Sequence, residues 1–289
     1  MQRTVLGLAG LALLSAAAAA QAMMVAPPVI PLRVAPADAV VVGKVTGFAD
    51  KAVAAVRFPG GTDTVNYQIA LVQVEEALFG ASGAKTLRVG FLPPPPPGPP
   101  GGRGRPPVRR NLLPNLTLNQ EACLFLVKHP AGDFYVLPAY YDVLNKKDNP
   151  AFAKEVDEAR RCAKLLAAPK AGLGSSNKDD RTLTAVMLVA RYRTPRWHAG
   201  KPPKEEPIDA AQSEAILKAL AEADWAIRNP RQAQGSPQAM FNRLGLTEKD
   251  GWVPPKDAGR WAEVAKEWLK AHADSYRVRR FVTDKGGKD

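Results

Sequence analysis

The sequence has few of the residues that build metal sites and covalent catalytic sites. Its 289 residues include two cysteines and three histidines. His129, His198 and His272 lie far apart, and neither an H-x-x-x-H nor a C-x-x-C pattern is present. A zinc ion would therefore find almost no ligands. A G-x-S-x-G elbow, the usual setting of a nucleophilic serine in α/β-hydrolases, is also missing. We expect no metal, no cofactor and no catalytic residue that the sequence can identify.

Long apolar runs are missing except at the N-terminus. Arg3 precedes an uncharged run rich in Leu and Ala, and Ala20-Gln21-Ala22 matches the A-x-A pattern that signal peptidase cleaves. The run is shorter than the ~20 strongly apolar residues of a membrane span. We expect a signal peptide over residues 1–22, with an uncleaved anchor as the alternative. The mature chain would have no transmembrane span and would be periplasmic or extracellular.

Acidic residues are scarce relative to basic ones. The chain has 40 Lys and Arg residues against 28 Asp and Glu residues, a formal net charge of +12. Such a balance favours anionic surroundings, such as lipid headgroups, acidic polysaccharide or nucleic acid. Export makes nucleic acid the least expected of these partners. The alternative is that the charge serves solubility alone.

The spacing of apolar residues changes from a period of two to a period of 3.6 near residue 149. Strands followed by helices predict an α+β protein, in which a small OB-like antiparallel β-barrel precedes an all-α helical domain. The boundaries that we predict are a Pro-rich extended lead-in over 23–36, the barrel over 37–148 with a disordered Pro/Gly/Arg loop at 93–115, the helical domain over 149–282, and a flexible tail over 283–289.

The first half contains six strand-like segments. They are residues 38–48, 51–58, 65–78, 87–92, 120–127 and 134–143. In the third segment the apolar face switches after Leu71, because Val72 and Val74 continue on the opposite face. The switch predicts a bulge or a sharp bend in a long strand.

The second half carries helical stripes and capping signals. Stripes begin near 149, 180 and 209, and a last helix is expected over about 256–276. Asp209 with Gln212 resembles a capping box. Ser236 followed by proline is typical of a helix start, and Gly245 marks the end of that helix.

The sequences of the strand-like segments resemble those of the OB-like barrels of netrin/TIMP-like modules and of similar bacterial exported proteins of unknown function. The resemblance covers roughly residues 37–145, and its pieces are Val40–Val45, Val72–Val74, Leu78–Gly80, Cys123–Leu126 and Asp133–Val136. In TIMP-type inhibitors a cysteine at the mature N-terminus engages the catalytic zinc of the target. Here the mature chain would begin at Met23, with no cysteine before Cys123. The inhibitory role is therefore not carried over.

Two segments could contact a ligand. Four arginines follow a run of prolines and glycines, and no acidic residue accompanies them: Arg103, Arg105, Arg109 and Arg110. Guanidinium groups bind phosphate, sulfate or carboxylate, so we predict a polyanion-binding arm, with a tolerated low-complexity insertion as the alternative. Trp197, in a polar loop, is a candidate for an exposed aromatic contact.

The remaining candidates are structural. Glu75 and Glu76 are neighbours on a strand and point to opposite faces, so they cannot act as a catalytic pair. Asp133 and Asp142 are interpreted as turn and edge residues. In an oxidising compartment the two cysteines predict one disulfide, Cys123–Cys162.

Together these observations favour an exported, non-enzymatic binding or interaction protein of the cell envelope that contacts an anionic polymer, an anionic surface or a protein partner. A secreted hydrolase with an unlocated carboxylate site and a structural envelope component remain the two alternatives.

Overall fold

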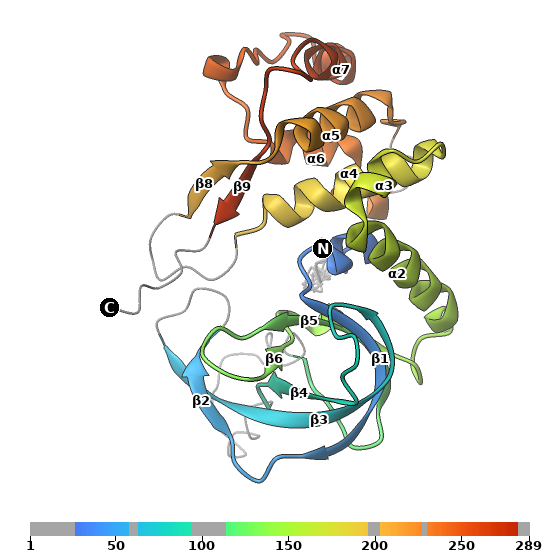
Figure 1. The fold of residues 1–289 in the computed structure, drawn as a ribbon, viewed down its shortest axis with the longest axis vertical. Helices are drawn as coiled ribbons and strands as arrows, with labels where there is room; N and C mark the ends of the chain where they lie inside the picture. The colour runs from blue at the N-terminus through green and yellow to red at the C-terminus, as the bar shows by residue number, and fades with distance from the viewer. Residues whose placement is uncertain (1–26, 58–62, 94–113, 196–202, 227–229, 283–289) are drawn as a thin grey trace, which may run out of the picture.

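The computed structural model describes residues 27–57, 63–93, 114–195, 203–226 and 230–282. Figure 1 shows a sheet half and a helical half, with the first described residues between them. The chain is therefore α+β, as predicted. The proposed signal peptide, the arginine-bearing arm, Trp197 and the tail at 283–289 all lie outside the described residues.

The described residues of the sheet half form seven strands. Their bounds are β1 Ala39–Phe48, β2 Val53–Val56, β3 Thr64–Phe79, β4 Thr86–Phe91, β5 Glu121–Lys128, β6 Tyr135–Val136 and β7 Val143–Asn145. β1 pairs antiparallel with both β3 and β5, and β3 also pairs with β4. β6 lies parallel to β4 and antiparallel to β5, and β2 and β7 extend the sheet through β3 and β5.

The pairing of β1 with β3 is irregular where the sequence predicts a change of face, but the residue left over there belongs to β1 and not to the long strand β3. The register between β1 and β3 shifts where Val45 and Gly47 oppose Val72 and Leu71. The Thr46 hydroxyl, at the residue left over, donates to the Leu71 carbonyl at 3.2 Å. The extra residue bends β1 and β3 together, which increases local twist.

The segment predicted as one strand over 134–143 is broken. Only Tyr135–Val136 is a strand, a 3-10 turn follows at Tyr140–Asp142, and β7 then begins. The reason is Pro138, which has no N–H to donate to a ladder. The Asp142 carboxylate instead accepts the Ala139 N–H at 2.8 Å and closes the turn.

Within the part of the chain that the structure describes, the helical half is built on seven α-helices, the first of which precedes β1. Their bounds are α1 Ile30–Val34, α2 Phe152–Ala167, α3 Pro169–Leu173, α4 Lys178–Tyr192, α5 Ala210–Glu222, α6 Pro237–Arg243 and α7 Trp261–Ala271. Asp209 and Ser236 cap α5 and α6 as predicted, because their side chains accept the N–H of Gln212 and of Ala239. α7 is shorter than predicted.

The prediction of an extended lead-in over 23–36 is wrong at α1. Ile30 and Val34 lie one helical turn apart, and both are buried in the main core. Pro31 is tolerated because the N–H that it lacks would be unpaired in the first turn. Beyond the helix, Arg191 of α4 donates to the Ala35 and Ala37 carbonyls at 2.9 and 3.0 Å. These bonds fix the segment between the two halves.

The prediction that the second half is all-α is also wrong. Strands β8 Lys204–Pro207 and β9 Arg279–Val282 pair antiparallel. Charges hold this small sheet together: Arg193 contacts Glu205 at 3.0 Å and lies over the Phe281 ring at 4.4 Å. Without alternating apolar residues, the pattern of hydrophobicity gives no signal for it.

The two halves share one hydrophobic core. The largest cluster joins Val40 and Phe125 of the sheet to α2, α4, α5 and α7. A second cluster, which includes Val72 and Leu124, fills the interior of the sheet half. The boundary between the halves is therefore packed, and a cavity within it has fixed walls.

Candidate functional site

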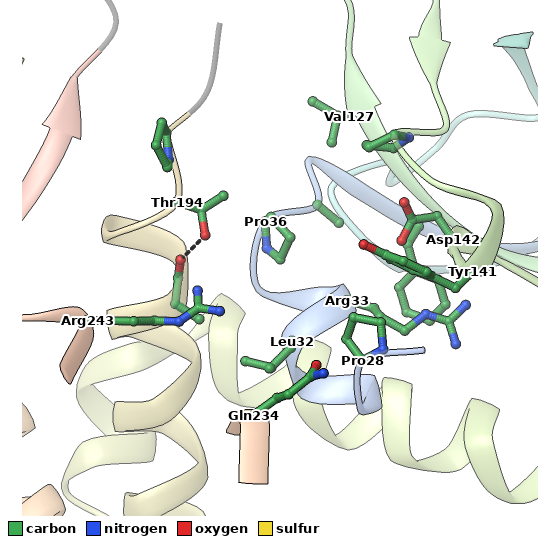
Figure 2. A pocket seen from close by; sticks show the side chains of 15 residues that line it. Pro28, Leu32, Arg33, Pro36, Val127, Tyr141, Asp142, Thr194, Gln234 and Arg243 are labelled. Carbon is green, nitrogen blue, oxygen red and sulfur yellow. Dashed lines mark hydrogen bonds between the residues drawn. The ribbon is translucent and has the colours of Figure 1, made fainter. Parts of the chain in front are cut away.

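A cavity of about 280 Å³ lies at the junction of the two halves. Its apolar walls include Leu32, Pro36, Phe125, Val127, Pro138 and Pro195. Its polar side chains are Arg33, Tyr141, Asp142, Thr194, Gln234 and Arg243. Figure 2 shows Arg33, Tyr141 and Asp142 grouped on one side and Thr194 and Arg243 on the other. Residues from α1, from the interrupted strand segment 134–143, from α4 and from α6 therefore line the same cavity.

Arg33 is the most unusual residue of this cavity. Its place in α1, between the buried Ile30 and Val34, leaves only 5% of it exposed. The guanidinium carbon lies 4.3 Å from the centre of the Phe125 ring. Its Nε and one terminal nitrogen are buried without a hydrogen-bond partner. Burial lowers the pKa of Arg33, but a guanidinium stays charged in a protein at any ordinary pH. The wall of the cavity therefore contains a buried cation, and its two unpartnered nitrogens lie beneath the accessible surface of that wall.

Asp142 brings an opposite charge to the same cavity. The turn at Pro138 places it there, and only 7% of the residue is exposed. Burial raises the pKa of Asp142 to about 7, although Arg33 and the Ala139 N–H both act to lower it. Among the described residues, no ion pair joins Asp142 to Arg33. The carboxyl group therefore titrates near neutral pH.

The other polar groups mark the rim. The Thr194 hydroxyl already has a hydrogen-bond acceptor, since it donates to the Ala190 carbonyl at 2.6 Å. Tyr141 is half-buried, and burial raises the pKa of its phenol. Arg243, the last residue of α6, is exposed, and its carbonyl accepts from Arg193 at 2.9 Å. Arg243 adds a second cation at the mouth of the cavity.

Most acidic residues considered in the sequence have structural partners. Asp133 pairs with Lys128 at 2.6 Å, and Glu76 pairs with Arg160 of α2 at 2.8 Å. The interpretation of Asp142 as a plain turn residue was incomplete, because the turn that it closes is buried against the helical half. No metal-binding cluster of three or more His, Cys, Asp or Glu residues occurs in the described part of the chain.

The predicted Cys123–Cys162 disulfide is not formed. Both cysteines are free and buried. Different charged neighbours act on them, chiefly Arg33 on Cys123 and Glu158 on Cys162. Both thiols belong to the largest hydrophobic cluster, where each packs as a small apolar group.

Burial raises the pKa of each thiol to about 12. Since the thiolate is the reactive form, we expect both thiols of the folded protein to react with a disulfide reagent at pH 8 at least about a hundredfold more slowly than after unfolding in guanidinium chloride. Thiol counting without reductant checks this expectation. Two thiols should appear on unfolding. Their appearance only after reduction would instead demonstrate the bond that the sequence predicted.

Comparisons with other proteins identify no relative. No protein family, no curated protein and no solved structure matches the chain. Within the described residues, no helix is long and apolar enough to cross a membrane. The cavity between the two halves is therefore the feature from which a function can be inferred.

Proposed function

We propose that the chain is an exported binding protein whose cavity takes a small organic carboxylate. The observation that carries this proposal is the buried guanidinium of Arg33 in the wall of a cavity that is otherwise largely apolar, where two of its nitrogens have no partner and a small movement of the side chain would bring them to a ligand. A buried unsatisfied donor costs about 1–3 kcal/mol, and more when it is charged. A carboxylate offers the bidentate geometry that a guanidinium fits best. An anionic ligand would therefore recover free energy that the empty site loses.

The size of the cavity limits the ligand. A dry cavity of about 150 Å³ holds benzene, so the cavity of about 280 Å³ has room for about a dozen non-hydrogen atoms. The apolar walls favour a hydrocarbon or aromatic body. Arg243 at the mouth would attract anions to the entrance. A small carboxylic acid with one ring is the best match.

We also propose that the sheet half is an OB-like barrel. The pairings support this proposal, because they run from β1 through β3, β4, β6 and β5 and return to β1. In an OB-fold the five strands form a partly open Greek-key barrel. The proposed ligand site would then lie on the outer side of the barrel, where β5 meets α1.

The other two functions considered from the sequence are less well supported. Glycoside hydrolysis generally uses two carboxyl groups, and Asp142 is the single carboxylate among the described residues that line the cavity. A purely structural role gives no reason for an unpartnered buried arginine. The arginine-bearing arm stays a separate prediction, and its binding of an anionic polymer is compatible with a small-molecule site elsewhere.

The test is a calorimetric titration with 3-phenylpropanoate and with 3-phenylpropanamide, which has nearly the same shape but no charge. We expect the carboxylate to bind at least tenfold more tightly than the amide, because a hydrogen bond to a charged group contributes about 1.5–3 kcal/mol. Arg33→Met should weaken binding of the carboxylate about tenfold to a hundredfold.

The matched control is Arg243→Met, which removes the exposed arginine of the same cavity and should reduce affinity only a few-fold. Unchanged affinity in Arg33→Met would overturn the proposal. So would a failure of the wild-type protein to bind 3-phenylpropanoate and other carboxylates of this size at millimolar concentration.

A further inference from the structure

The cavity holds two buried charged groups of opposite sign that do not satisfy each other. Arg33 and Asp142 are 5% and 7% exposed, and both line the cavity. They are near enough to influence each other electrostatically. Nevertheless, among the described residues neither forms an ion pair with the other. A site evolved for a simple anion gains nothing from a carboxyl group in this position, since an ionised carboxylate repels the ligand.

We propose that the ligand is a small zwitterion of the amino-acid type, with its carboxylate on Arg33 and its ammonium group on Asp142. The inference rests on the proposed function and assigns the chemical class of its ligand. It also assigns to Asp142 the role of a specificity determinant, which distinguishes an amino acid from the acid that lacks the amino group.

The hydrogen-bonding capacity of Asp142 fits this role. One carboxylate oxygen, Oδ2, accepts the Ala139 N–H at 2.8 Å, and this bond fixes the orientation of the side chain. A carboxylate can accept about four hydrogen bonds, and an ammonium group donates three. The half-buried Tyr141 lies beside Asp142 in Figure 2 and can offer its hydroxyl as a further acceptor. The apolar body of the ligand would contact Leu32 and Val127.

The charges around Asp142 allow the site to respond to pH. Arg33 of α1 and the phenol of Tyr141 lie on the same side of the cavity as Asp142, and Arg243 of α6 lines the opposite wall. The pKa of Asp142 is about 7 without ligand. An ammonium group favours the ionised carboxylate, so a bound zwitterion lowers this pKa and expels the proton. Affinity for the zwitterion should therefore fall as the pH decreases below about 7. Affinity for an acid without an ammonium group should rise.

The experiment compares three ligands that differ by one charged group each: L-phenylalanine, 3-phenylpropanoate and 2-phenylethylamine. In titrations of the full chain at pH 8 we expect phenylalanine to bind about tenfold to a hundredfold more tightly than either of the others. Asp142→Asn should remove the preference over 3-phenylpropanoate, because the amide carries no charge while its oxygen can still accept the Ala139 N–H. Thermal unfolding of the variant verifies that it is folded.

A second measurement needs no variant. Between pH 8 and pH 6 the wild-type protein should lose about tenfold in affinity for phenylalanine and gain affinity for 3-phenylpropanoate. The zwitterion proposal would be overturned if 3-phenylpropanoate binds through Arg33 while phenylalanine binds no more tightly and shows the same pH dependence. The proposed function would then remain intact. If no ligand of the series binds, both proposals fail.

Discussion

Replacing Arg33 by methionine is expected to stabilise the ligand-free protein while it weakens binding of the carboxylate about tenfold to a hundredfold. Methionine keeps much of the length and apolar contact of the arginine, including contact with Phe125, and removes donors that are buried without partners. Replacing unsatisfied buried charges by apolar side chains often increases stability. We expect the free energy of unfolding to rise by about 1–3 kcal/mol at pH 6, measured by urea titration.

The choice of pH matters for this measurement, because Arg33 also stabilises the ionised form of Asp142. The pKa of Asp142 is about 7 in the folded protein, above its usual value, so its contribution to stability is complete below about pH 4 and is lost as the pH rises through about 7. At pH 6 the carboxyl group is mostly protonated and tolerates the loss of Arg33. Arg243→Met should change stability by less than about 0.5 kcal/mol. If Arg33→Met instead lowers the free energy of unfolding by about 1–3 kcal/mol or more, the guanidinium has a partner inside the protein.

Substitution of Gly80 by alanine is expected to be the most damaging single methyl addition in the sheet half. Gly80 follows β3 with φ +70°, and a Cβ there would lie 1.8 Å from the Asp38 carbonyl oxygen. Asp38 is fixed, since its carboxylate accepts the Lys128 N–H at 3.0 Å and its own N–H donates to the Leu126 carbonyl at 2.8 Å. The start of β1 would have to move. Backbone strain and overpacking together predict a loss of about 2–5 kcal/mol.

Gly83 provides the matched control. Its φ is +80°, but a Cβ would find nothing within 4 Å. Gly83→Ala should therefore cost only the conformational penalty, about 1 kcal/mol. Denaturant titration of the two variants separates the steric effect from the backbone effect. If both variants lose the same free energy of unfolding, β1 and β3 separate easily at Gly80. The segment before β1, which carries Arg33, would then be less rigid than proposed.

The elements with a strong periodic signal were predictable from the sequence. α2, α4 and α5 have regular apolar spacing, and β3 alternates on either side of its change of face. The caps at Asp209 and Ser236 depend on local chemistry alone. The small sheet of β8 and β9 was not predictable, because its stability comes from contacts such as Arg193 with Glu205 between distant segments. α1 was missed because proline suggested an extended chain, whereas tertiary burial of Ile30 decides its conformation.

The candidate site was harder to foresee than the fold. Arg33 is one of 40 basic residues, and its position between apolar residues does not reveal that it is buried. The sequence favours a turn or edge role for Asp142, because it does not show that Pro138 turns this residue toward the helical half. Their proximity is a consequence of tertiary packing.

The most direct measurement of the central claim is the ¹⁵N–¹H NMR spectrum of the arginine Nε–H groups during titration with 3-phenylpropanoate. The account predicts that one Nε–H resonance, identified as Arg33 by its loss in Arg33→Met, moves downfield on binding and exchanges more slowly with solvent, because the carboxylate accepts its hydrogen bond. If every arginine resonance that responds to the ligand persists in Arg33→Met, the anion binds elsewhere and the account is contradicted.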